Sequence, residues 1–280
     1  MPEVVEVKKY ADFIRKNLLN KNLTQINILK GRYKTHSPFH GYNLLLQNKI
    51  IKVDNKGKLL WIELKNNIYI TFTLGLSGGF LLIKNKKIKF PKIFSNELFK
   101  NEAVDHLNVE FKTQSFSIYF YDTLSYGTIK VYFTKDDFNK KLNKLGPDIM
   151  NINFEIFKNQ IFKNLNKEIG NVIVNQKLIS GIGNYLRSDI LWLAKVSPFR
   201  LVKKIKPNEL KNIFDSAKNL TWNNYNKKSF SKTFKSPSSY GRVFFVYMQD
   251  TDIFGNKVIK KELYEGSQKR SVYYVKERQI

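Results

Sequence analysis

Cysteine is absent from the 280 residues of this chain, and histidine occurs only three times. Without thiols the protein can form neither a disulfide nor a zinc site with thiolate ligands. The three histidines, His36, His40 and His106, are too few for a convincing metal cage. We therefore expect no metal and no other cofactor, and any catalysis must use amines, carboxylates and hydroxyl groups.

Acidic residues are also scarce. Aspartate and glutamate together number 23 against 49 lysines and arginines, which gives a formal net charge of +26. A folded chain with this excess creates a strong positive field, and nucleic acid is the polyanion that such a field favours. An AT-rich coding genome would explain many of the lysines, but it would not explain the shortage of acids.

Long apolar runs are missing as well. No stretch has the length needed to span a bilayer, and the start of the chain is acidic and mixed, unlike a signal peptide. Hydrophobic residues at 42% are typical of a globular protein, and the length suits one large or two modest domains. The sequence therefore predicts an intracellular protein that is not secreted and has no membrane partner.

The order of patterns along the chain predicts an α+β protein. Apolar residues at helical spacing run from Val4 to Leu19, and short β-rich stretches from Ile26 to about Tyr132 indicate a sandwich or barrel. We expect a β-sandwich domain with an N-terminal helix at 1–134, a linker at 135–147, a helical domain at 148–226, and a loop with a terminal β-hairpin at 227–280. Within the last part, "NKKSFSKTFKSPSSYGR" looks like an exposed loop, and "VFFVYM", "KVIKKEL" and "KRSVYYVKERQ" look like strands.

The first residues, "MPEVVEV", offer an unusual chemical group. Methionine before a small residue is normally trimmed, and its removal would leave Pro2 as a terminal secondary amine. Glu3 follows directly, and Glu6 lies one helical turn further on, where the positive end of the helix dipole favours acids. By itself this stretch is far more often an ordinary terminus.

The stretch "NQKLISGIGNYLRSDILWLAKVSPFR", residues 175–200, predicts a tight reversal between two helices. Gly181 and Gly183 allow the turn, and Asn184 begins the second helix. Exposed backbone N–H groups at a helix N-terminus are a natural phosphate site, although Gly-x-Gly between helices often means only a turn.

Together these segments resemble the Fpg/Nei family of DNA glycosylases. "GIGNYLRSDIL" followed by "SPF" is similar to the family's helix–two-turn–helix motif, and "MPEVVEV" is similar to its Met-Pro-Glu-x-Pro-Glu-Val start. "NKGKLLWIEL" resembles the hairpin with the family's characteristic lysine, "LGLSGGF" its Leu-Gly-Met-Ser-Gly segment, and "LGPD" its connector. The matches keep the family order from residue 2 to about 200. Because the chain has no cysteine, it is most similar to the Nei-like branch with a zincless finger.

The resemblance implies a base-excision-repair DNA glycosylase and AP lyase that removes oxidised bases. The amine of Pro2 would attack the sugar C1′ and form a Schiff base. Glu3 would protonate the ring oxygen and relay protons in the β- and δ-eliminations that cleave the strand. Glu6 would support them by orienting the N-terminus.

The resemblance also implies a set of DNA contacts. Lys58 matches the family's hairpin lysine, which implies a third catalytic residue that contacts the phosphate beside the lesion and aids proton transfer. Lys56 is a competitor that is more simply explained as solvated. Asn184 matches an asparagine that holds a phosphate. Arg270 fits the arginine at the tip of the zincless finger, although Lys269 is only one residue away.

Two loops imply how the gap left by an extruded nucleotide is filled. Leu76 replaces the family's methionine, and either side chain can wedge between bases. The second loop, usually Asp-Pro-Arg-Arg-Phe-Gly, reads "DTLSYG" here, so both arginines are missing and Tyr126 remains to stack. This departure favours substrates that need little reading of the opposite base, including single-stranded DNA. A further departure is Val5 in place of a proline.

The expected partner is damaged DNA, either double- or single-stranded. We expect the protein to act as a monomer and to be located with the DNA, in a nucleus, a nucleoid or a viral replication site. An alternative is a non-catalytic damaged-DNA-binding relative of the same fold, which Val5, Leu124 and Ser125 would permit. A general basic RNA-binding protein is a more distant alternative, because no RNA-module motif is present.

Overall fold

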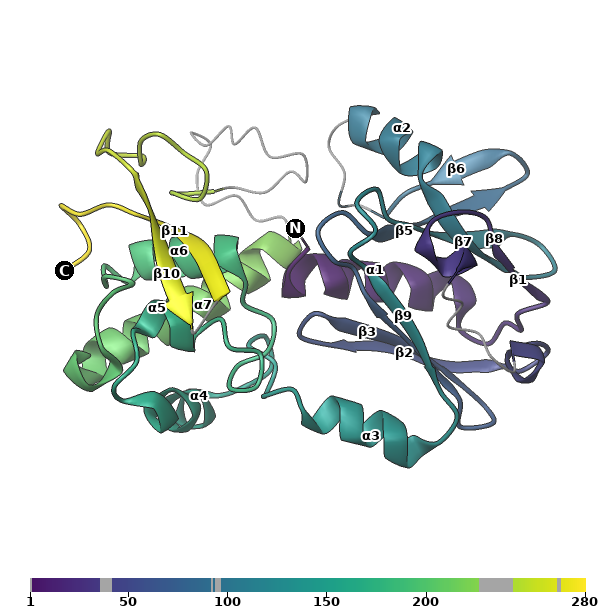
Figure 1. The fold of residues 1–280 in the computed structure, drawn as a ribbon, viewed down its shortest axis with the longest axis horizontal. Coiled ribbons are helices and arrows are strands. Elements are labelled where there is room, and N and C mark those ends of the chain that lie inside the picture. Colours follow the sequence, from purple (N-terminus) through teal and green to yellow (C-terminus); the bar gives the residue numbers. More distant parts are fainter. Residues whose placement is uncertain (1, 36–41, 92, 94–96, 227–243, 266–267) are drawn as a thin grey trace. The chain divides into compact units, whose positions relative to one another are not determined.

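The computed structural model describes residues 2–35, 42–91, 93, 97–226, 244–265 and 268–280. Its contacts divide the chain into two compact units (Figure 1). The first contains Pro2 and residues 6–143, and the second contains residues 3–5, 144–226 and the described residues from 244 onward. Met1 and residues 227–242 of the expected loop lie outside the described residues. Residues 3–5 thus fold with the second unit, although the first unit follows them in sequence.

Two antiparallel sheets form the first unit. Alternation of side chains along each strand gives each sheet one face for a shared core, as period-two patterning requires. The five-stranded sheet has the order β1 (Gln25–Ile28), β7 (Leu107–Lys112), β8 (Ser117–Tyr121), β5 (Gly79–Lys84) and β6 (Lys87–Lys89). The four-stranded sheet has the order β2 (Ile50–Lys56), β3 (Leu59–Leu64), β4 (Tyr69–Thr73) and β9 (Thr128–Tyr132).

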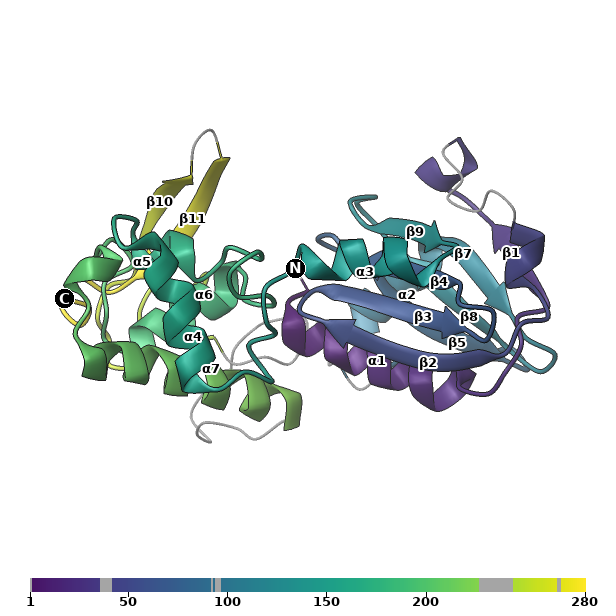
Figure 2. The same cartoon turned by 90° about the horizontal axis from the view of Figure 1, so that it is seen from below.

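Helix α1 (Val4–Leu18) runs alongside the sheets (Figure 2). Its apolar spacing places Val7, Tyr10 and Ile14 in the core that both sheets share. Rings from the two sheets meet there: the Phe72 and Phe80 centroids are 5.1 Å apart in an edge-to-face arrangement. The shorter helices of this unit are η1 (Arg32–Lys34), η2 (Tyr42–Leu45) and α2 (Glu97–Asp105).

The stretch expected to be a linker begins with a helix, α3 (Lys135–Asn143). Thr134 caps it, because the Thr134 hydroxyl accepts from the Asp137 N–H at 3.2 Å, and the same hydroxyl donates to the Asp137 carboxylate at 3.0 Å. Phe138 then stacks on Tyr69 at 4.1 Å and packs against Trp61, on the face of the four-stranded sheet away from the core. The capping pattern and this one buried ring account for the helix.

Helices dominate the second unit. Helix α6 (Asn184–Leu193) packs against α7 (Pro207–Asn226) and strand β11 (Gln268–Tyr274). Its Leu186, Ile190 and Trp192 join a core that also contains Val4 and Val5. The helices are α4 (Phe154–Ile161), η3 (Phe162–Asn164), α5 (Ile169–Val172), α6 (Asn184–Leu193), η4 (Val202–Lys204) and α7 (Pro207–Asn226). Val5, noted above as a departure from proline, is thus a buried core residue inside α1.

The chain ends in the expected β-hairpin, β10 (Ile259–Glu265) and β11 (Gln268–Tyr274), which packs on α6 (Figure 1). The first expected strand, "VFFVYM", is wrong for its described residues 244–248, which form turns. The carboxylate of Asp189 captures the N–H groups of Val246 and Tyr247, so this segment folds onto a helix. The α+β class predicted from the sequence is confirmed.

Candidate functional site

The carboxylate of Glu3 holds the beginning of helix α6. Its Oε2 accepts hydrogen bonds from the N–H groups of Gly183 at 2.6 Å and Leu186 at 3.4 Å, and its Oε1 accepts one from Tyr185 at 3.0 Å. The first N–H groups of a helix have no partner within the helix, and the helix dipole favours a negative charge there. Glu3 is only 1% exposed, so its carboxylate has a fixed position and direction.

The turn before α6 is shaped to receive residues 3–5. Gly181 has φ of +111°, a conformation that side chains disfavour, and a Cβ placed on it would lie 2.8 Å from the Cβ of Val4. The Val4 N–H donates to the Gly181 carbonyl at 3.1 Å. Glycine at 181 is therefore required both by the backbone conformation and by the close approach of Val4.

Pro2 immediately precedes this anchored glutamate and is buried. Glu6, in the first turn of α1, is buried as well. A nitrogen at residue 2 would therefore lie one residue from a carboxylate whose position is fixed by three backbone hydrogen bonds. Such a pair can move a proton between an amine and a carboxylate.

Asn184 is the first residue of α6, as the sequence predicted, and its Oδ1 accepts from the Nη2 of Arg187 at 3.4 Å. Arg270 lies in β11, opposite Leu263 in the hairpin register. The competing Lys269 forms an ion pair with Glu262 across the hairpin at 2.7 Å. Because successive residues of a strand point to opposite faces, the side chains of Lys269 and Arg270 lie on opposite faces of the hairpin.

Lys58 lies in the two-residue turn between β2 and β3, after Gly57 with φ of +55°. Figures 1 and 2 both show the β2–β3 turn at the same end of the first unit as the start of α1. Lys56, its competitor, donates to the carbonyl of Leu142 at 3.2 Å. Lys56 thus has a structural contact with the end of α3.

Leu76 and Tyr126 lie on two loops that are bonded to each other. The Ser77 hydroxyl donates to the carboxylate of Asp122 at 2.8 Å and accepts from the Leu124 N–H at 2.9 Å. A Cβ on Gly75 would lie 2.6 Å from the carbonyl carbon of Tyr126, so glycine lets the loops touch. Leu76 is 37% exposed and Tyr126 is 62% exposed. The two side chains therefore project from one joined surface.

Sequence reasoning named Leu124 only as a departure from the family pattern and missed two further residues, Arg187 and Asp189. Leu124, 54% exposed, adds a third apolar side chain to the joined loops. Arg187 and Asp189 are fully buried in α6, although a charged residue in a helix is normally assigned to the surface. Their positions beside the apolar Leu186 and Ile190 were the only available signal.

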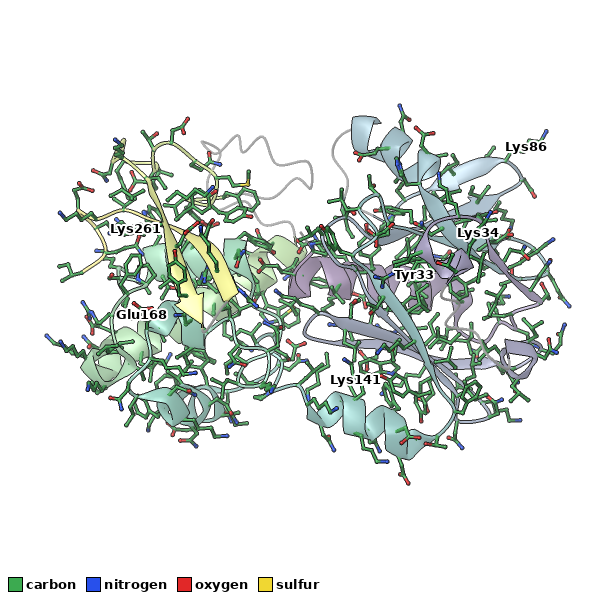
Figure 3. The ribbon with its side chains drawn as sticks, viewed as in Figure 1. Tyr33, Lys34, Lys86, Lys141, Glu168 and Lys261 are labelled. Atoms are coloured by element: carbon green, nitrogen blue, oxygen red, sulfur yellow. The ribbon has the colours of Figure 1, made fainter. Side chains whose placement is uncertain are left out.

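Lysines extend over both units, and Figure 3 shows Lys86 at the β5–β6 turn and Lys261 on β10, both exposed. Within the described ranges there is no cluster of three acidic or histidine side chains that could hold a metal ion. Nor does this part of the chain contain a helix long and apolar enough to cross a membrane.

Two family models match the chain. Residues 1–129 match the formamidopyrimidine-DNA glycosylase N-terminal domain, and residues 145–234 match the formamidopyrimidine-DNA glycosylase H2TH domain. Among curated relatives, the formamidopyrimidine-DNA glycosylase of Ureaplasma parvum is 29% identical over 230 residues, covering 81% of this chain and 74% of the relative. That of Prochlorococcus marinus is 28% identical over 233 residues, covering 79% and 78%.

Solved structures share the fold over nearly the whole length. The complex of Lactococcus lactis Fpg with DNA containing an abasic site has a TM-score of 0.76 at 17% identity, covering 99% of both chains. MutM in complex with DNA containing carbocyclic 8-oxo-G has a TM-score of 0.77 at 18% identity, covering 100% of both chains. Because both family models match in order along the sequence and the fold is shared, this chain belongs to the Fpg/Nei family of DNA glycosylases.

Proposed function

We propose that this protein is a base-excision-repair enzyme, a DNA glycosylase and AP lyase that removes oxidised bases from damaged DNA. The observation that carries the proposal is the Glu3 carboxylate, which adjoins Pro2 in sequence and is bonded to the N-terminus of the helix that begins with Asn184. The acid thus adjoins the nitrogen in sequence and is bonded to the helix whose first residue, Asn184, would hold a phosphate. Relatives named formamidopyrimidine-DNA glycosylase support the reaction class.

The proposed nucleophile is the nitrogen of Pro2 after removal of Met1. An α-amino group has an ordinary pKa of about 8, so much of it is protonated at neutral pH. Glu3 accepts that proton and leaves a free amine. The amine bonds to C1′ while the bond from C1′ to the base breaks, and the remaining N–H proton leaves with the base. Glu3 then protonates the ring oxygen, the C1′–O4′ bond opens, and the nitrogen lone pair completes the iminium.

The iminium makes the C2′ protons acidic. Loss of a C2′ proton to the Glu3 carboxylate breaks the C3′–O bond and releases the 3′-phosphate, which is β-elimination. Loss of a C4′ proton then releases the 5′-phosphate, which is δ-elimination. Water hydrolyses the remaining imine and restores the amine of Pro2. Glu6 supports this chemistry from the buried first turn of α1.

The DNA contacts are divided between the two units, so each unit contributes part of the grip. Lys58 and the joined loops that carry Leu76 and Tyr126 belong to the first unit, while Asn184 and Arg270 belong to the second. Exposed apolar side chains on the loops would fill the gap left by the extruded nucleotide. The β10–β11 hairpin, in a chain with no cysteine, would act as a zincless finger held by strand pairing and by its packing on α6.

End-labelled DNA with one abasic site, as duplex and as single strand, tests the proposal. We expect strand cleavage at the abasic site and release of oxidised bases from lesion-containing DNA. Tight binding without cleavage would refute the enzymatic function and favour the non-catalytic relative. Binding to plain RNA as tight as binding to abasic DNA would refute both.

A further inference from the structure

Arg187 has an environment that a cation rarely occupies. Its side chain is 0% exposed, and its Nε has no hydrogen-bond partner among the described residues. Removing a guanidinium from water is costly unless its donors are satisfied. Arg187 is nevertheless near the middle of α6, between the core residues Leu186 and Ile190. This cost points to a use beyond packing.

The contacts of Arg187 join three separate segments. Its Nη2 donates to the carbonyl of Ser271 at 2.6 Å and to the Oδ1 of Asn184 at 3.4 Å. Its Nη1 approaches the carbonyl of Gly170 in α5 at 3.4 Å. Ser271 is the residue after Arg270, so one guanidinium holds the side chain of Asn184 and the backbone beside Arg270.

The charge of Arg187 also interacts with the charges of two candidate site residues, Glu3 and Arg270. Burial lowers the pKa of Arg187 to about 10, while the charge of Glu3 raises it and that of Arg270 lowers it further. Arg187 therefore stays protonated at neutral pH. Its proton donors remain available to Asn184 and Ser271 throughout the range in which DNA binding is measured.

We infer that Arg187 is a positioning residue that sets Asn184 and Arg270 in one arrangement for binding the DNA backbone. The inference rests on the proposed function, because it assigns both partners to DNA. Bonding of the Asn184 Oδ1 to Arg187 leaves the amide N–H₂ as the donor suited to a phosphate oxygen. Since Arg187 is buried, it neutralises no phosphate itself, and this separates its role from a direct contact.

Arg187→Met keeps an unbranched, flexible side chain and removes the guanidinium with all its donors. We expect it to weaken binding to an abasic duplex about tenfold, the effect of losing a charged hydrogen bond. The slope of the salt dependence should fall by no more than about the one unit that Arg270→Gln removes, because Arg187 itself neutralises no phosphate. In the Asn184→Ala background, Arg187→Met should weaken binding by clearly less than tenfold, because only its hold on the backbone beside Arg270 is still lost. Arg187→Lys, with a single donor group, should fall between wild type and Arg187→Met.

Lys218→Met is the matched control. Lys218 is a partly buried cation in the same unit whose Nζ bonds to the carbonyls of Met150 and Ile152 at 2.5 and 3.2 Å. The Lys218→Met substitution should lower the melting temperature of the protein without weakening its binding to DNA. If Lys218→Met weakens binding as much as Arg187→Met, or if the Asn184→Ala background leaves the full tenfold effect, the inference is wrong.

A further fall in the salt slope when Arg187→Met is added to Arg270→Gln would also refute the inference, because it would mean that Arg187 itself contacts a phosphate. If Arg187→Met does not fold, Arg187→Lys is carried through the same cycle and must show the same coupling to Asn184. Wild-type protein that binds but never cleaves abasic DNA would refute the proposed enzyme and leave this inference intact, because the inference concerns binding.

Discussion

Asp189 predicts an unusual dependence of stability on pH. Its side chain is 0% exposed, and its Oδ1 accepts from the N–H groups of Val246 at 3.0 Å and Tyr247 at 3.1 Å. Its Oδ2 has no hydrogen-bond partner among the described residues. Burial raises the pKa of Asp189 to about 7, although the backbone hydrogen bonds oppose the rise. The folded protein therefore holds a proton at this site that the unfolded chain releases.

The direction follows from proton linkage. An unfolded aspartate has a pKa of about 3.9, so between about pH 4 and pH 7 only the folded state binds this proton. Stability must therefore fall as pH rises, by about 1.4 kcal/mol per pH unit. The contribution is fully present below pH 3.9 and is lost as the pH passes 7. From pH 5 to pH 8 the loss is on the order of 3 kcal/mol.

Asp189→Asn isolates this effect, because asparagine resembles the protonated acid and does not titrate. Guanidinium unfolding followed by tryptophan fluorescence at pH 5 to 8 gives the stability difference between the variant and wild type. The free energy of unfolding of the variant, relative to that of wild type, should rise by about 3 kcal/mol from pH 5 to pH 8. Burial would raise the pKa of Asp252 too, but hydrogen bonds from Asn256, Phe254 and Trp192 lower it overall. Asp252→Asn should thus differ from wild type by a constant amount. A difference for Asp189→Asn that is constant or falls with pH would refute the reasoning.

Two further predictions use matched pairs. Glu3→Gln places an amide against three backbone donors and should lower the free energy of unfolding by about 2 kcal/mol. Glu155→Gln, at an exposed position in the first turn of α4, should change it by less than about 0.5 kcal/mol. Equal losses for the two variants in guanidinium unfolding would contradict the hydrogen bonding described for Glu3. Lys58→Ala should lower the slope of the salt dependence of DNA binding by about one unit. Lys56→Ala should lower the stability of the protein, because its bond to the Leu142 carbonyl is lost, and should leave the slope unchanged. A slope that changes only in the Lys56 variant would reverse the assignment.

Repetitive patterns explain which elements the sequence predicted. The apolar spacing of Val7, Tyr10 and Ile14 predicted α1, and Gly181 with Gly183 predicted the start of α6 at Asn184. Elements that depend on single contacts were missed. The helix α3 depends on the cap that Thr134 supplies and on Phe138 packing against distant strands.

The candidate site shows the same division. Family resemblance proposed Glu3 and Asn184, but the hydrogen bonds between Glu3 and α6 join positions more than 170 residues apart through backbone N–H groups, which no side-chain pattern reveals. The turns that follow residue 243 were missed because Asp189 captures their backbone. From the sequence alone, a charged residue that is buried to make such a contact cannot be told from one on the exposed face of a helix.

The central claim is that the nitrogen of Pro2 forms the covalent bond to DNA. Its most direct test is borohydride reduction of the protein on abasic DNA, followed by mass spectrometry of the peptides. We predict a deoxyribose adduct on the N-terminal peptide, with Met1 absent and Pro2 as the modified residue. An adduct on Lys58, or efficient strand cleavage by protein that retains Met1, would contradict the account.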